Sequence, residues 1–237
     1  MPSLARRLTA EALGTFGLVF VGAAVVVVNG GFPNSGIGLL GIALAHAVVL
    51  SVMVSATMTI SGGHLNPAVT LGLLVTRRID LISALAYIVT QLAAAVLAAL
   101  SVKLLLPANA TRSAMLGVPV IASSVSLGQA IGIELVLTFF LMSAVFGTAI
   151  SVEAPRVAGF GIGLVLLFDI LVGGPLTGGV MNPARAFGPA AVSGEWVGHL
   201  VYWIGPIAGS LLAALLWEYV LLPKTPPRRR RTDLVAQ

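Results

Sequence analysis

The chain has 237 residues, of which 58% are hydrophobic and 9% are charged, and its mean hydropathy is +1.05. Soluble domains contain roughly 45–50% apolar and ~25% charged residues, so this composition excludes an ordinary soluble domain and is typical of a membrane protein. The formal net charge of +5 implies no nucleic-acid partner, because basic residues beside membrane helices set topology. The sequence has no cysteine, which excludes disulfides, thiol catalysis and cysteine metal sites.

Continuous apolar stretches without the alternation of barrel strands predict an all-α membrane protein. A helix that crosses a bilayer needs ~20 mostly apolar residues. Glu11 within the first stretch favours a retained helix over a cleaved signal peptide. The predicted transmembrane helices cover about residues 8–28, 36–59, 81–105, 128–150, 157–174 and 197–222.

An even number of crossings places both ends of the chain on one side of the membrane. Most basic residues fall on that side: Arg6, Arg7, Arg77, Arg78, Arg156, Lys224 and Arg228 to Arg231. The opposite side receives Lys103 and Arg112. The positive-inside rule therefore predicts cytoplasmic termini, a multi-pass protein of the cell membrane, and a basic cytoplasmic tail at 223–237.

The sequence contains an internal repeat. Glu11 begins Glu-x-x-Gly-Thr-Phe in the first span, and Glu134 begins Glu-x-x-Leu-Thr-Phe in the fourth. Each half has three spans, so the second half should enter the membrane inverted, as in many transport folds. We expect the first inverted repeat at 1–106, a connecting loop at 107–127 and the second repeat at 128–222.

Each repeat carries a Gly-Gly-x-x-Asn-Pro-Ala segment: SGGHLNPAVTLG at 61–72 and TGGVMNPARAFG at 177–188. The residues that follow are too few for a span and too apolar for a solvated loop, which predicts re-entrant half-helices at 66–76 and 182–192. Asparagine is a favoured N-cap and proline suits the first helical position. The predicted pore motifs are Asn66, Pro67, Ala68, Asn182, Pro183 and Ala184.

In inverted halves the two helix N-termini meet near the membrane midplane, where the amides of Asn66 and Asn182 donate toward a cavity. Glu11 and Glu134 are carboxylates within spans, and we expect them to support the re-entrant segments by accepting backbone hydrogen bonds. The role of Asp169 stays open between holding a loop and reaching the pore.

The paired Asn-Pro-Ala motifs, the arginine at 185 and the two glutamates resemble the aquaporins, the major intrinsic protein family, over residues 1–222. The resemblance implies six tilted helices, two half-helices and a homotetramer with one pore in each subunit. It also implies that both asparagines orient a passing water molecule, which interrupts proton transfer, and that Arg185 repels cations near the outer constriction.

In aquaporins four positions form the selectivity filter, and the resemblance assigns them to His46, Ile170, Gly179 and Arg185. This set is similar to that of the plant tonoplast intrinsic proteins and related ammonia-permeable aquaporins. Some of those have a further histidine after the third span, and residues 106–127 contain none. His64 and His199 are expected to be structural. The resemblance implies a passive channel in the lipid membrane for water and small neutral solutes, including ammonia, that excludes protons and ions.

Two alternative functions are a channel for a different solute and a transporter with a different mechanism. A glycerol or small polyol facilitator would have aspartate where Ala186 stands. An ion-coupled secondary transporter would need a coupling site, yet the span carboxylates beyond the repeated pair are Asp169 and Glu218. No Ser/His/Asp or His-Glu-x-x-His pattern occurs, so we expect no enzyme, catalytic residue, metal or cofactor.

Overall fold

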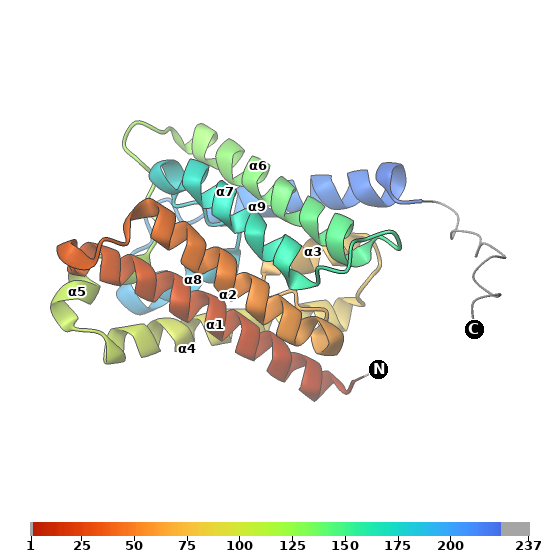
Figure 1. The fold of residues 1–237 in the computed structure, drawn as a ribbon, viewed down its shortest axis with the longest axis horizontal. Helices are drawn as coiled ribbons and strands as arrows, with labels where there is room; N and C mark the ends of the chain where they lie inside the picture. The colour runs from red at the N-terminus through yellow and green to blue at the C-terminus, as the bar shows by residue number, and fades with distance from the viewer. Residues whose placement is uncertain (1, 224–237) are drawn as a thin grey trace.

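The computed structural model describes residues 2–223, which are helical without strands in this range (Figure 1). The α-helices are α1 (Leu4–Gly31), α2 (Gly38–Ser61), α3 (Pro67–Val75), α4 (Leu81–Leu105), α5 (Ala108–Ser113), α6 (Leu127–Val145), α7 (Gly159–Thr177), α8 (Pro183–Ser193) and α9 (Val201–Leu216). Short 3₁₀ turns are η1 (Pro33–Ser35) and η2 (Met115–Gly117), and short π-helical turns are η3 (Phe146–Ile150) and η4 (Trp217–Leu221).

Six helices within residues 2–223 are long and apolar enough to cross a membrane, which confirms the predicted fold class. They are α1, α2, α4, α6 with η3, α7, and α9 with η4. The first helix begins earlier than predicted because Ser3 caps it, its Oγ accepting a hydrogen bond from the N–H of Arg6 at 3.4 Å. The last begins later than predicted because residues 197–200 form turns, with Gly198 at φ +67°.

The two short helices α3 and α8 begin at the Asn-Pro pairs. Before them, Gly62 caps the end of α2 with φ +93° and Gly178 caps the end of α7 with φ +92°, a backbone conformation that favours glycine. Four non-helical residues then lead to the proline that starts each half-helix. Figure 1 shows α3 in one half of the molecule and α8 in the other, with α3 packed on α9 and α8 packed on α4.

Glycines allow the close packing of the helices that surround the half-helices. Gly163 lies against the backbone of α2, Gly209 against α6 at Leu135, and Gly188 against α4 at Ala95. A Cβ atom at any of them would overlap backbone atoms of the neighbouring helix. In lipid, where burial of apolar surface drives association weakly, such close contacts between small residues hold helices together.

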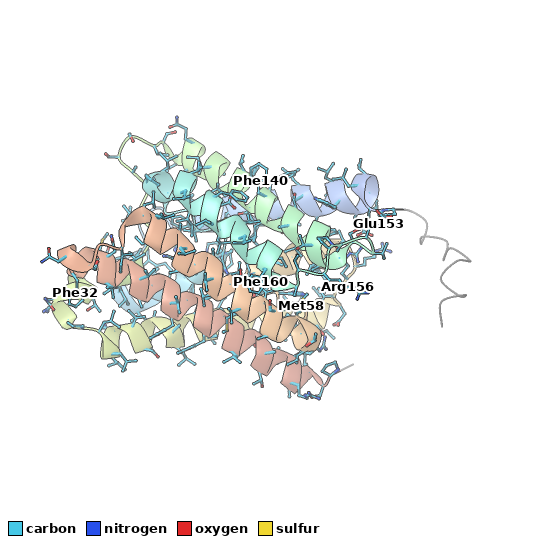
Figure 2. All side chains as sticks on the ribbon, viewed as in Figure 1. Phe32, Met58, Phe140, Glu153, Arg156 and Phe160 are labelled. Carbon is cyan, nitrogen blue, oxygen red and sulfur yellow. The ribbon has the colours of Figure 1, made fainter. Side chains whose placement is uncertain are left out.

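Labelled residues identify the two ends of the molecule. Figure 2 shows Glu153 and Arg156 in the α6–α7 connection at the end where α1 begins, and Phe32 at the opposite end. We call these the N-terminal side and the far side. The segment at 107–127, predicted as a connecting loop, contains α5 and η2. Lys224 and Arg228 to Arg231, which the prediction placed in a basic tail, lie outside the described residues.

Candidate functional site

A cavity of about 380 Å³ lies at the centre of the helices, between the beginnings of α3 and α8. Side chains of both sequence halves line it, and apolar residues such as Leu50, Leu141 and Leu166 form much of its wall. The structure brings six of the residues singled out in the sequence to this cavity: His46, Asn66, Ile170, Gly179, Asn182 and Arg185. The other members of the two motifs are buried but do not line it: Pro67, Ala68, Pro183 and Ala184.

Each asparagine caps the half-helix that follows it. Oδ1 of Asn66 accepts a hydrogen bond from the N–H of Ala68 at 2.8 Å. Oδ1 of Asn182 accepts from the N–H of Ala184 at 3.0 Å and of Arg185 at 3.3 Å. These bonds fix the amide planes, so the side-chain nitrogens point away from their own helices.

The side-chain nitrogens of the two asparagines form hydrogen bonds between the two sequence halves. Nδ2 of Asn66 donates to the carbonyl of Met181, and Nδ2 of Asn182 donates to the carbonyl of Leu65, both at 2.9 Å. Leu65 and Met181 have φ of +50° and +55°, a conformation that costs a non-glycine residue roughly 1–2 kcal/mol. The reciprocal bonds hold both strained carbonyls in place. An amide nitrogen has two hydrogens, so each retains a second donor for the cavity.

Two buried carboxylates hold the segments that lead to the half-helices. Glu11 accepts hydrogen bonds from Ser61 Oγ (2.7 Å), the N–H groups of His64 (3.0 Å) and Leu65 (2.7 Å), and Gln91 Nε2 (2.8 Å). Glu134 accepts from Thr177 Oγ1 (2.6 Å) and from the N–H groups of Val180 (3.0 Å) and Met181 (2.7 Å). Both side chains are fully buried, so these bonds satisfy backbone donors that water cannot reach.

A pair of tyrosines adds a second support that the sequence analysis missed. The hydroxyl of Tyr87 donates to the carbonyl of Ser61 at 2.8 Å, and that of Tyr202 donates to the carbonyl of Thr177 at 2.9 Å. Both carbonyls belong to the last residue of a helix that ends before a half-helix. The tyrosines follow Asn66 and Asn182 at nearly the same sequence distance, which is the signal that would have revealed them.

Arg185 lines the cavity and is buried. Its Nη1 donates to the carbonyl of Gly117 at 2.8 Å, so the segment between the halves helps to orient the guanidinium. Gly117 has φ +75°, and a Cβ atom there would lie 2.9 Å from Cα of Ala23. Conformation and space therefore both require glycine at the residue that holds Arg185.

His46 is fixed from two sides. Its Nδ1 lies 2.9 Å from the carbonyl of Ile42, and because a carbonyl only accepts, Nδ1 carries the proton and Nε2 is an acceptor. The ring packs on Gly22 of α1, where a Cβ atom would lie 2.6 Å from Nε2. A glycine in the neighbouring helix therefore makes room for the imidazole in the cavity wall.

Ile170 and Gly179 lie next to each other in the wall of the central cavity. A Cβ atom on Gly179 would lie 3.2 Å from Cα of Ile170, so the segment before Asn182 packs closely on α7. Gly179 has φ +58°, which disfavours any side chain there. The cavity wall thus consists of backbone at this point.

Asp169, next to Ile170, is not among the residues that line the cavity. It is buried, and its two carboxylate oxygens have no hydrogen-bond partner among residues 2–223. The carboxylate does not hold the segment before Asn182 with its side chain, and it does not reach the cavity. Asp169 and Glu134 are both buried, but Asp169, unlike Glu134, has no hydrogen-bond donor in the described part of the chain.

The remaining histidines differ in their surroundings. His64 lines the N-terminal side of the central cavity, which the sequence analysis did not anticipate. Its Nδ1 lies 3.2 Å from Thr70 Oγ1, and its ring makes an edge contact with Tyr87. His199, before α9, accepts a hydrogen bond at Nε2 from Trp203 Nε1 at 3.1 Å, and partial burial lowers the pKa of its imidazole.

A family model described as major intrinsic protein matches residues 1–217. Aquaporin TIP4-4 of Zea mays is 43% identical over 224 residues, 90% of this chain and 85% of its own length. Nodulin-26 of Glycine max is 40% identical over 222 residues, 93% of this chain and 80% of its own length. The X-ray structure of the aquaglyceroporin from Plasmodium falciparum has the same fold, with a TM-score of 0.83 at 24% identity, and the match covers 92% of this chain and 97% of that one.

Proposed function

Because the chain belongs to the major intrinsic protein family, whose members are membrane channels and not enzymes, we propose that its central cavity conducts water and ammonia and excludes protons and other ions. The observation that carries this proposal is the convergence of His46, Ile170, Gly179 and Arg185 with both capping asparagines on one cavity. We infer that these residues act as the pore motifs and the selectivity filter, with Glu11 and Glu134 as structural supports.

Proton exclusion follows from the charges at the centre of the cavity. The N-termini of α3 and α8 meet there, and each helix end is equivalent to roughly +0.5 charge. The free amide hydrogens of Asn66 and Asn182 would bind the oxygen of a passing water, which turns both its protons outward and breaks a chain of water molecules. Arg185 adds a full positive charge on the same cavity.

The mixed chemistry of the filter favours ammonia as a second solute. Nε2 of His46 and the guanidinium of Arg185 supply an acceptor and donors, whereas Ile170 is apolar and Gly179 contributes no side chain. Ammonia is similar to water in size and loses less solvation free energy on entering a partly apolar passage. Glycerol is larger, so a polyol facilitator is the less favoured alternative.

We predict that exchanging both wall residues, His46→Phe with Ile170→His, lowers the ratio of ammonia to water permeability. The double variant makes the apolar side polar and retains Gly179, whose φ of +58° would strain any replacement. Proteoliposomes should be compared in stopped-flow experiments under ammonia, water and glycerol gradients. Ammonia flux at the lipid background, or an unchanged ratio in the double variant, would refute the ammonia assignment and leave water as the solute.

We also predict that Arg185→Val retains water flow and admits protons or larger solutes. In the wild type the guanidinium of Arg185, held by its bond to Gly117, narrows this part of the cavity and makes it polar. The variant removes both the fixed charge and that bond. Arg112→Val, an exposed arginine on α5, is the matched control. If dissipation of a pH gradient and urea uptake are the same in both variants as in the wild type, Arg185 does not contribute to selectivity.

The arrangement in the membrane completes the proposal. Residues 1–106 and 128–222 form inverted repeats, and each contributes one half-helix to the pore. The chain assembles as a homotetramer with a pore in each subunit, consistent with exposed apolar side chains on α2, α6 and α7 such as Val52, Val136 and Phe160. The protein lies in the cell membrane, and its basic N-terminal side faces the cytoplasm. Arg156 lies at that end (Figure 2).

A further inference from the structure

A second, more open cavity of about 570 Å³ lies on the N-terminal side, beside the central cavity. We call it the basic cup, and the residues that line it include Arg7, His64, Arg77, Arg78, Asp80 and Tyr87. Gly62, His64 and Arg78 also line the central cavity. A ligand in the basic cup would therefore stand next to the entrance of the proposed pore.

Three arginines from two separate parts of the chain converge on the basic cup. Arg7 comes from α1, whereas Arg77 and Arg78 come from the turn between α3 and α4. The preference for basic residues on the cytoplasmic side accounts for their sign and their side of the membrane. It does not account for their convergence on one cavity.

Among residues 2–223, only part of this positive charge is neutralised by an ion pair. Arg78 pairs with Glu218, its Nη2 at 2.7 Å from Oε2. Arg7 and Arg77 have no ion pair among residues 2–223. One carboxylate lines the cup, that of Asp80, and it caps α4 by accepting from the N–H of Ser83 at 2.9 Å.

Arg7 retains an unused donor. Its Nη2 donates to Ser83 Oγ at 3.1 Å and its guanidinium lies over the ring of Tyr87 at 5.9 Å. Its Nε is buried and has no hydrogen-bond partner among the residues that the structure describes. A buried donor of this kind is costly unless an acceptor reaches it, and an anion in the basic cup would supply one.

Arg77 occupies a backbone position that favours glycine. Its φ is +59°, and the turn after α3 is closed by hydrogen bonds from the N–H of Arg77 to the carbonyl of Leu74 and from Arg78 to Leu73, both at 2.9 Å. This pattern places Arg77 at the left-handed residue of a Schellman motif, where glycine is most common. The sequence has a charged side chain at the lip of the cup, at a cost in backbone conformation.

We propose that the basic cup binds a phosphate monoester, supplied by the headgroup of a membrane lipid. Guanidinium groups bind phosphate oxygens in pairs, and a monoester carries more charge than the diester of most phospholipids. Leu81 and Ile82, directly after Asp80, are 59% and 75% exposed, so an apolar surface for acyl chains adjoins the cup.

Native mass spectrometry of the full chain in phosphatidylcholine nanodiscs tests this site. The nanodiscs would also contain phosphatidic acid, a monoester, or phosphatidylglycerol, a diester, in equal amounts. We expect retention of phosphatidic acid on the wild type, at least about tenfold above phosphatidylglycerol, because the more highly charged monoester forms stronger charge-assisted hydrogen bonds with the arginines. Inorganic phosphate added alone should compete weakly, since it lacks acyl chains. If inorganic phosphate bound as strongly as phosphatidic acid, a lipid headgroup would be refuted as the source of the bound phosphate.

Variants assign the binding to the cup. Arg77→Gly removes the charge and keeps the left-handed turn, so a loss of lipid cannot be attributed to misfolding of the turn. It should lower retention about tenfold, Arg7→Gln should do the same, and Arg77→Lys should retain part of the binding. Arg112→Gln on the far side is the control and should bind as the wild type. Retention unchanged in Arg77→Gly and Arg7→Gln would show that these arginines set topology only.

Discussion

Exchanging a carboxylate for an amide is expected to have opposite effects at two buried positions, Glu134 and Asp169. Glu134 accepts hydrogen bonds from Thr177, Val180 and Met181, and an amide nitrogen in place of one oxygen would face a backbone donor. Glu134→Gln should therefore destabilise the fold by about 1.5–3 kcal/mol for each bond lost. The carbonyl of Met181 would also move, and with it the bond to Asn66.

Asp169→Asn should instead raise the thermal midpoint. Both oxygens of Asp169 are buried without a partner in the described part of the chain, so the amide removes an ionisable group that is costly to bury and breaks no hydrogen bond. Fluorescence-detected size exclusion after heating gives the midpoints of both variants, and osmotic shrinkage of proteoliposomes gives their water permeability. The expected order is Asp169→Asn above the wild type above Glu134→Gln, with reduced permeability only in the last. A lower midpoint for Asp169→Asn would reveal a partner for this carboxylate.

A methyl group on Gly22 is expected to narrow the pore by pushing the ring of His46 into the cavity. The new Cβ would lie 2.6 Å from Nε2 of His46, and the bond from Nδ1 to Ile42 prevents the ring from moving along its own helix. The imidazole must therefore turn toward the cavity. Overpacking of this kind costs about 1–3 kcal/mol, and we predict that Gly22→Ala lowers water permeability several-fold.

Two further variants separate this effect from the general effect of replacing a glycine in a membrane helix. Gly132→Ala adds the same group to α6, where nothing lies within 4 Å, and it should keep the wild-type permeability. Gly22→Ala combined with His46→Ala should recover water flow, because the smaller side chain leaves room for the methyl group. Normal flow in Gly22→Ala alone would mean that His46 does not form the pore wall.

The helices and the Asn-Pro-Ala segments were predictable from the sequence because their signals are local. Long apolar stretches identify membrane helices, and Asn-Pro identifies the start of each half-helix. The half-helices predicted at 66–76 and 182–192 correspond in sequence to α3 (Pro67–Val75) and α8 (Pro183–Ser193). The duplicated motifs also predicted that the two asparagines would meet.

The contacts between distant segments were not predictable in the same way. Asn66 donates to the carbonyl of Met181, and Asn182 donates to the carbonyl of Leu65. The direction of these carbonyls depends on positive φ at two non-glycine residues, and no sequence pattern predicts that conformation. The bond from Arg185 to Gly117 depends on the path of the segment at 107–127, which propensity does not determine. The convergence of three arginines on the basic cup likewise arises only from tertiary packing.

We propose that the cavity between the two half-helices passes water and not protons. The most direct measurement records osmotic shrinkage and the decay of an imposed pH gradient in the same proteoliposomes of the wild-type chain. We predict shrinkage much faster than in protein-free liposomes, with decay of the pH gradient no faster than in those liposomes. Shrinkage at the protein-free rate, or a pH gradient that collapses together with the water flux, would contradict the account.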